Sequence, residues 1–234
     1  MKVFGSVLLP LIPFCAGPSK ATEPPPDLRI LSRADLGAKS PVAKMKRHEP
    51  SLITIHHPAT LQMPDRPPTG KLQTLQKFSP SEGKLDNGKP KPAWPDVPYH
   101  FYIDCRGAVA EALDVNAVSD TNTEYDPTGH VLVALEGNFE KEQVTDAQWL
   151  TLRKMVSWLV ARCHVVPANM QGHKDYAQLL CPAKDLQRRL GGLREMLEAW
   201  EYRRESSRSQ AQRPDNSGRH PRDDHSVRIR LTLN

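Results

Sequence analysis

Apolar residues occur along the chain in a pattern that predicts strands and helices in mixed order. Residues 52–56 form a short β-branched run between two prolines, which predicts a buried strand. Residues 99–103 predict a second strand, followed by a turn over 104–107. Residues 130–135 predict a third strand, which a glycine-asparagine pair ends.

Helical periodicity appears in three other segments. Residues 145–163 repeat apolar positions at helical spacing, and Thr145 with Gln148 matches a capping box. A last helix is predicted over 184–201, although two central glycines each cost it about 1 kcal/mol. A shorter helical stretch surrounds Leu75. Strands mixed with helices of this length predict an α/β fold, in which helices flank a central mixed β-sheet.

The two ends of the chain differ from its middle. Residues 1–21 have a charged start, an apolar run and a small-residue end, which together predict a cleaved export signal. The alternative is an apolar N-terminus without that role. The remaining predicted parts are a proline-rich linker (22–27), one folded domain (28–200) and an Arg-rich disordered tail (201–234), in which 227–233 is either unstructured or an added strand. We therefore expect a periplasmic or secreted protein.

Composition and charge narrow the choice of partners. The formal net charge is +5, and a weak positive field favours an anionic polymer such as cell-wall material or nucleic acid. The sequence contains no arginine-aromatic nucleic-acid module, so no nucleic-acid partner is expected. The N-terminal apolar run is too short for an integral membrane span, and we expect a monomer. Four cysteines do not form a disulfide framework in a chain of this length, which leaves a Cys105–Cys163 pair as an open possibility.

Two histidines and a cysteine form a candidate zinc set. His56 closes a predicted buried strand, and His173 and Cys181 flank a short loop. Two imidazoles and a thiolate suit zinc, and three protein ligands leave a fourth position open, as in catalytic sites. Strand alternation sends His56 and His57 to opposite faces, so only one of them is expected to bind the metal. The alternative is that these histidines are ordinary buried residues.

Five segments that occur in order between residues 28 and 197 carry a family resemblance. They are 31–38, 53–60, 94–104, 137–140, and 172–176 followed by Cys181-Pro182. Together they resemble the N-acetylmuramoyl-L-alanine amidase family, which includes phage amidases and peptidoglycan recognition proteins. Segment 53–60 resembles the zinc-binding strand of that family, and the last segment is similar to its closing metal loop. Five ordered matches are more specific than any one of them.

The resemblance implies a zinc hydrolase that acts on peptidoglycan. It implies that His56, the first histidine of the pair, binds one Zn²⁺ with His173 and Cys181 at one end of the sheet, and that Tyr99 is catalytic. Zinc in such a site lowers the pKa of water to about 7 and polarises a carbonyl. The implied scissile bond is the amide between the lactyl group of N-acetylmuramic acid and L-alanine. The expected partners are peptidoglycan or muropeptides.

Neighbouring residues receive lesser roles. Asn138 and Lys174 are candidate substrate-binding residues, with a strand-ending asparagine and a solvated lysine as the plainer alternatives. His57 and His100 either support the ligands from a second layer or are simply buried. Tyr99 has its own plain alternative, a partly buried strand tyrosine whose hydroxyl only finds a partner.

The chain departs from the family pattern in the metal loop. Leu179 stands where the family usually has threonine or lysine, and Ala183 replaces a common glycine. Leucine cannot donate a hydrogen bond to an oxyanion, and the loss of one such donor costs about 10²–10³ in rate. Two hypotheses follow: an active amidase in which Lys174 or Tyr176 substitutes, or a zinc-holding protein that binds wall fragments without cutting them. A third reading, a nucleic-acid protein that uses the Arg-rich tail, predicts salt-dependent retention on DNA.

Overall fold

The computed structural model describes residues 23–84, 88–121, 123 and 125–211. The chain divides into two compact units, Met1–Glu198 and Ala199–Asn234. The first unit contains the whole sheet and every candidate site residue named above, and the described part of the second unit is helical.

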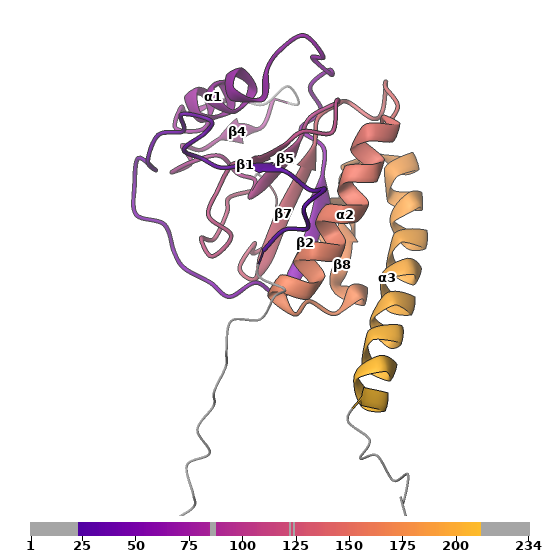
Figure 1. The fold of residues 1–234 in the computed structure, drawn as a ribbon. Helices are drawn as coiled ribbons and strands as arrows, with labels where there is room; N and C mark the ends of the chain where they lie inside the picture. The colour runs from indigo at the N-terminus through magenta and orange to yellow at the C-terminus, as the bar shows by residue number, and fades with distance from the viewer. Residues whose placement is uncertain (1–22, 85–87, 122, 124, 212–234) are drawn as a thin grey trace, which may run out of the picture. The chain divides into compact units, whose positions relative to one another are not determined.

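A six-stranded mixed sheet forms the centre of the first unit (Figure 1). Its strands are β1 (Ile30–Leu31), β2 (Leu52–His56), β5 (Phe101–Ile103), β6 (Val109–Glu111), β7 (His130–Leu135) and β8 (Met170–Gly172), and a separate hairpin pairs β3 (Gly83–Lys84) with β4 (Pro90–Lys91). The strand order is β1-β6-β5-β7-β2-β8. Neighbouring strands run parallel except β5 and β6, which run antiparallel. This arrangement confirms the predicted mixed sheet.

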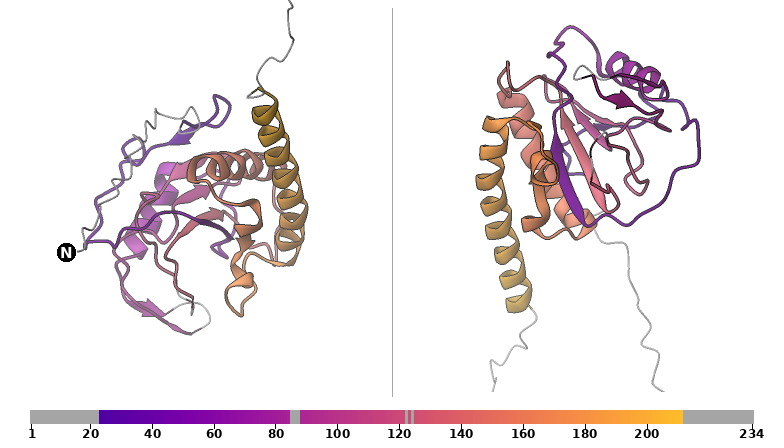
Figure 2. Two further views of the ribbon diagram at one scale, coloured as in Figure 1. Left: turned by 90° about the horizontal axis from the view of Figure 1, so that it is seen from below. Right: turned by 180° about the vertical axis from the view of Figure 1, so that it is seen from behind.

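Within the described residues, three α-helices accompany the sheet. They are α1 (Pro68–Phe78), α2 (Asp146–Cys163) and α3 (Lys184–Ala211), with short 3-10 turns η1 (Pro167–Asn169) and η2 (His173–Asp175) on either side of β8. The predicted capping box is present at α2, where the Thr145 hydroxyl accepts from the Gln148 backbone N–H and the Gln148 side chain accepts from the Thr145 N–H. Figure 2 shows α2 and the first part of α3 side by side.

The two faces of the sheet have different coverings because side chains alternate along each strand. The register pairs His56 with Ala134 and Ala134 with Tyr102, so these three side chains share one face. On that face Tyr102 and Ala134 pack in a cluster with Leu72 of α1. The opposite face carries Phe101, whose ring meets Trp158 of α2 edge-on at a centroid distance of 5.9 Å. His56 therefore points to the face that α2 does not cover.

A buried ion cluster ties α1 to the ends of two strands. The Lys71 ammonium lies 2.8 Å from a Glu136 carboxylate oxygen and 3.5 Å from an Asp104 oxygen, and all three side chains are at most 3% exposed. The same Glu136 carboxylate accepts from the backbone N–H groups of Cys105 and Met63. These bonds fix the loop that follows β2 against the carboxyl ends of β5 and β7.

Several boundaries differ from the predicted ones. The second predicted strand begins at Phe101 rather than at residue 99, and α3 runs to Ala211 instead of ending at 201. The predicted disordered tail therefore begins too early, because residues 202–211 are mostly Arg, Glu, Ser and Gln, several of which favour helix. Cys105 and Cys163 are free thiols, so the possible disulfide between them is not formed. The predicted export signal over 1–21 and the alternating segment 227–233 lie outside the described residues.

Candidate metal centre

Two adjacent parallel strands place the two histidines together. In the register of β2 with β8, Ile55 pairs with Gly172. His56 follows Ile55, and His173 follows Gly172. Both imidazoles therefore lie at the same end of the sheet. The sheet topology alone thus joins residues that are far apart in the sequence.

The loop after β8 returns Cys181 to the same end of the sheet. The Lys174 backbone N–H donates to the Cys181 carbonyl at 2.8 Å, which closes the loop. The Asp175 carboxylate accepts from the Gly172 N–H at 2.9 Å and from the Gln187 side-chain amide, which holds the loop against α3. After the cysteine, Ala183 has φ 81°, a conformation that favours the glycine usual in the family.

The three candidate ligands converge closely enough for one metal ion. Their ligand atoms all lie within 4.8 Å of one another. The Cys181 Sγ is 3.9 Å from the His56 Nδ1, and the two imidazole centroids are 4.1 Å apart. Zinc bound tetrahedrally at the usual lengths to a sulfur and a nitrogen would separate them by about 3.6 Å. The sulfur–nitrogen pair therefore needs a shift of about 0.3 Å to share a single zinc ion, and the set of three ligands suits zinc in its chemistry.

The protonation states of the two histidines suit a metal centre. Burial and the nearby His173 hold the pKa of His56 well below its usual value, and burial lowers the pKa of His173 to about 4. Both rings are therefore neutral at pH 7, as metal ligands must be. Burial raises the pKa of the Cys181 thiol to about 12, an effect opposed by the His57 backbone N–H, which lies 3.2 Å from Sγ. The His56 Nε2 is buried without a hydrogen-bond partner among the described residues.

His57 and Thr123 are neighbours of the ligands that stay outside the cluster. The His57 ring accepts a hydrogen bond from the Phe139 backbone N–H at its Nδ1, 3.2 Å away, so its side chain serves the chain after β7 rather than the cluster. The Thr123 hydroxyl lies 3.1 Å from the His173 Nε2. That contact leaves Nδ1 as the free nitrogen of His173 and fixes the orientation of the ring, as hydrogen-bonded neighbours of metal ligands do.

The structure places Tyr99 beside the cluster, Asn138 in a turn after β7 and Lys174 on the surface. The Tyr99 ring centroid is 5.6 Å from that of His56, and burial, with a smaller effect of Cys181, raises its pKa above the usual value. Asn138 uses its side-chain oxygen to accept from the Glu140 N–H, which forms a turn after β7. Lys174 is exposed. Both remain predictions as substrate-binding residues.

His100 has a structural place rather than a place at the metal. Its Nε2 lies 2.9 Å from the Ala117 carbonyl, and its Nδ1 accepts from the Leu132 N–H at 2.8 Å. Both ring nitrogens are therefore committed to the backbone. The two alternatives for His100 were support of the metal ligands and simple burial. The structure shows burial, with the ring bonded to the backbone.

The residues that sequence reasoning missed lie in the segment before β7 and at the first residue of β7. Thr123 and Tyr125 both contact His173, the second through an edge-on ring contact at 5.5 Å. His130 and Tyr176 complete an aromatic group around Tyr125. No periodicity marks this segment, and a histidine at a strand start gives no sign of its partners.

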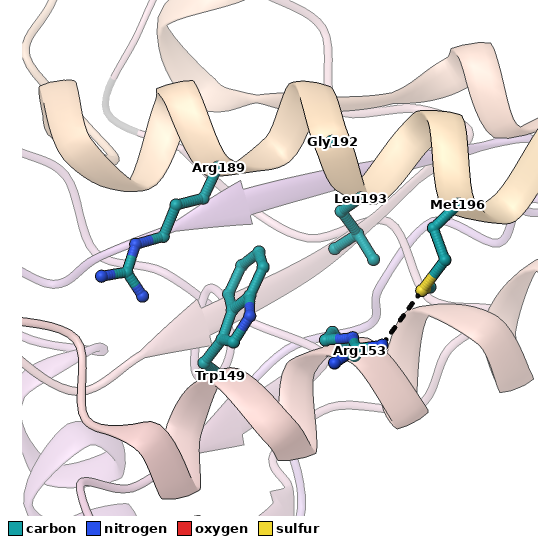
Figure 3. A pocket seen from close by; sticks show the side chains of 6 residues that line it. All are labelled: Trp149, Arg153, Arg189, Gly192, Leu193 and Met196. Carbon is teal, nitrogen blue, oxygen red and sulfur yellow. Dashed lines mark hydrogen bonds between the residues drawn. The ribbon is translucent and has the colours of Figure 1, made fainter.

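The surface also has a hollow, which is lined by residues outside the cluster. It has a volume of about 410 Å³ and lies between α2 and α3 (Figure 3). Trp149, Arg153, Arg189, Gly192, Leu193 and Met196 line it. None of these residues belongs to the candidate metal centre, so the hollow gives no support to a role in the chemistry.

Solved structures of other proteins share this fold. Drosophila peptidoglycan recognition protein LB matches with a TM-score of 0.57 and 21% identity, covering 69% of this chain and 92% of that chain. The N-acetylmuramoyl-L-alanine amidase LysC from Clostridium intestinale matches with a TM-score of 0.53 and 22% identity, covering 67% and 89%. The complex of tracheal cytotoxin with the ectodomains of peptidoglycan recognition proteins LCa and LCx matches at 0.56 and 17%, covering 68% and 92%. At these identities the likeness shows the fold.

The sequence itself places the chain in a family. The model of the N-acetylmuramoyl-L-alanine amidase family matches residues 46–185, which is more than half of the chain and includes all three candidate ligands. The chain belongs to this family. No curated protein sequence matches it. Across the described residues, each helix is too short or too polar to cross a bilayer.

Proposed function

We propose that this chain is a zinc-dependent amidase that hydrolyses the bond between N-acetylmuramic acid and L-alanine in peptidoglycan or its fragments. The observation that carries the proposal is the convergence of His56, His173 and Cys181, whose ligand atoms lie within 4.8 Å. Family membership supports the substrate class, and the fold neighbours include both amidases and peptidoglycan recognition proteins. The predicted export signal supports a periplasmic or secreted location.

His56, His173 and Cys181 would hold the zinc ion. When bound, zinc acts as a Lewis acid on the scissile carbonyl and makes water a better nucleophile at neutral pH. The chain keeps its ligands in place through Thr123, which bonds to the His173 ring, and through the His57 backbone N–H, which points at the Cys181 sulfur. Neutral imidazoles are the ligating form of both histidines, and the His57 N–H beside the sulfur opposes the effect of burial, which disfavours the Cys181 thiolate.

Tyr99 is the proposed catalytic residue. In the reaction a water oxygen adds to the carbonyl carbon while the C=O π pair moves to the oxygen. Collapse then restores the carbonyl and breaks the C–N bond, and the L-alanine nitrogen leaves with a proton that came from the water. Because burial keeps the Tyr99 hydroxyl protonated at neutral pH, it acts as a hydrogen-bond donor to the water or to the developing oxyanion.

Substrate recognition is proposed for Asn138 and Lys174. The Asn138 side-chain oxygen is used in a turn, which leaves its amide N–H groups to meet a polar substrate group. Lys174 is exposed next to His173, so its ammonium group is available to a substrate carboxylate. Peptidoglycan and muropeptides carry both kinds of group.

A specific departure favours a second candidate function. Leu179 cannot supply the hydrogen bond that threonine or lysine gives in most of the family. A chain that holds zinc but lacks this donor would bind wall fragments and cut them slowly or not at all. The second candidate is therefore a zinc-containing peptidoglycan-binding protein.

One experiment separates the two candidates. Purified protein is incubated with cell walls, with and without a chelator, and with zinc added back after chelation, and released peptides that begin with L-alanine are quantified. An amidase releases such peptides, loses this activity with chelator and regains it with zinc. Retained wall binding with no zinc-dependent release would establish the binding protein instead.

Matched cysteine variants test the site within the same assay. Cys181→Ser is expected to lose the bound zinc and the peptide release together, because a hydroxyl is a poor replacement for a thiolate ligand. Cys163→Ser serves as the control, since that thiol is half-buried in α2 and outside the cluster. Equal zinc content in the two variants would contradict the assignment of Cys181.

A further inference from the structure

The rings of Tyr125, Tyr176 and His130 form a compact group beside the metal centre. The Tyr125 ring stacks on Tyr176 at a centroid distance of 5.4 Å and lies 5.0 Å from the His130 ring. Its edge-on contact with His173, at 5.5 Å, connects the group to a candidate zinc ligand. Tyr125 is therefore a direct neighbour of the metal centre, although no motif points to it.

The group lies on the same face of the sheet as the metal centre. His130, Leu132 and Ala134 alternate along β7, and the register pairs His130 with Leu52 and Ala134 with His56. The Thr54 hydroxyl, two residues before His56 on β2, bonds to the His130 Nδ1 at 2.8 Å. This bond orients the His130 ring that supports Tyr125.

The described contacts give the Tyr125 hydroxyl no role in stabilising the fold. Its oxygen is buried and makes no hydrogen bond to any described residue. A buried hydroxyl without a partner is destabilising, so a group of this kind calls for an explanation. The rings around Tyr125 hold its side chain without satisfying its oxygen.

The hydroxyl is also in the state that a donor requires. A phenol hydroxyl ordinarily carries a proton at neutral pH and can donate it in a hydrogen bond. In a site shielded from water, a fixed donor of this kind interacts strongly with developing negative charge.

The other residues near the loop are weaker donors. Leu179 has no hydrogen to donate, and Lys174 is exposed, with its backbone N–H bonded to the Cys181 carbonyl. Tyr176 is half-buried, and its contacts to His130 and Tyr125 are made by its ring. Among these, only Tyr125 combines burial, an unused hydroxyl and contact with a candidate ligand.

We propose that the Tyr125 hydroxyl donates the hydrogen bond to the oxyanion that position 179 does not supply. The inference rests on the proposed amidase function for its catalytic part. In the reaction the oxygen of the former carbonyl gains the π pair, and Tyr125 shares its proton with that oxygen without giving it up. When the C–N bond breaks, the carbonyl forms again and the hydrogen bond weakens.

Three variants test the role of Tyr125 in turnover. Tyr125→Phe removes one oxygen and keeps the ring contacts, so we expect kcat to fall by about 10²–10³ with KM and zinc content little changed. Tyr176→Phe removes the hydroxyl of the rival donor and is expected to lower kcat by much less than Tyr125→Phe does. Leu179→Thr should add little to the wild type but should restore at least about tenfold in kcat to Tyr125→Phe, because it returns the missing donor.

A binding measurement tests the same hydroxyl without turnover. Acetohydroxamate offers zinc a negatively charged oxygen, and its affinity for the zinc-loaded proteins is measured by calorimetry. We expect Tyr125→Phe to weaken binding by about tenfold, the effect of one lost hydrogen bond, and Tyr176→Phe to weaken it much less.

The two measurements separate this inference from the proposed function. If the wild type releases no peptides, the amidase proposal fails and the acetohydroxamate affinities decide the role of Tyr125. Equal kcat and equal affinity in Tyr125→Phe and the wild type would overturn the inference. A large loss in Tyr176→Phe without one in Tyr125→Phe would also overturn it and would assign the donor to Tyr176.

Discussion

Two consecutive histidines at the end of β2 have different environments. The His56 Nδ1 faces the Cys181 sulfur at 3.9 Å, whereas the His57 Nδ1 accepts from the Phe139 N–H at 3.2 Å. The His57 ring also stacks on the Phe139 ring at 5.8 Å. One side chain therefore belongs to the proposed metal centre, and the other holds the chain that follows β7.

Because of this difference, alanine at the two positions is expected to change different properties of the protein. His56→Ala is expected to lose bound zinc and peptide release, because it removes one of three ligands. His57→Ala is expected to retain zinc but to lose about 1–3 kcal/mol of stability, since the Phe139 N–H is left buried without an acceptor. Elemental analysis and urea unfolding measure the two effects. Equal loss of zinc in both variants would contradict the assignment.

Sequence reasoning reached some residues of the candidate site and missed others for a physical reason. His56, His173 and Cys181 follow from ligand chemistry, and two of them stand next to strand ends, where the topology brings them together. Thr123 and Tyr125 lie in an irregular segment, and the bond from Thr123 spans 50 residues to His173. A single sequence does not show which distant residues an irregular segment contacts. These contacts are therefore found only in the three-dimensional structure.

At the scale of the elements, glycines serve different needs. A Cβ on Gly172, at the end of β8, would lie 1.8 Å from the Gln187 side chain and 2.9 Å from the Pro182 ring. A Cβ on Gly191, inside α3, would meet nothing within 4 Å. The first glycine is required by the close approach of the metal loop and α3, and the second only weakens its helix.

Alanine at these two positions should change stability in opposite directions. Gly191→Ala is expected to stabilise the protein by about 0.5–1 kcal/mol, because alanine restricts the unfolded chain and favours helix. Gly172→Ala is expected to destabilise it by about 1–3 kcal/mol, the usual cost of overpacking, and to reduce zinc retention through displacement of the loop. Urea unfolding of the pair is the measurement, and a gain in stability from Gly172→Ala would be inconsistent with the packing described here.

The length of an element decided how well it could be predicted. Strands β2 and β7, with five and six residues, and the capped helix α2 have clear patterns in the sequence. Strands β1, β6 and β8 have two or three residues, too few to show a period, and they form because longer neighbours offer them backbone partners. The structure also extends α3 past the predicted end, since the charged and polar residues there favour helix without an apolar stripe.

At the scale of the whole molecule, His100 makes stability depend on pH. Its ring bonds to the backbone through both nitrogens, at the Ala117 carbonyl and the Leu132 N–H, and stacks on His48. Burial lowers the pKa of His100 to about 4, compared with about 6.5 in an unfolded chain. The folded protein therefore resists protonation of this ring, and the unfolded chain accepts the proton first as pH falls.

The expected result is a loss of stability on acidification. The contribution of His100 is fully present above about pH 6.5 and is lost as pH falls toward 4, by about 3 kcal/mol in total. Urea midpoints at several pH values between 7.5 and 4.5 measure this loss. His100→Asn should be less stable at pH 7.5 but should show a shallower decline, because it cannot take up the proton. The same slope in both proteins would show that other groups account for the acid sensitivity.

The outermost strands of the sheet, β1 and β8, have two and three residues. Borders this short expose few main-chain groups to which a strand of another molecule can attach. Molecules that accumulate side by side on an insoluble polymer are pushed to high local concentration, the condition under which open borders seed aggregates. If the proposed action on peptidoglycan holds, the blunt borders of this sheet would allow crowding on such a surface while each molecule keeps its own fold.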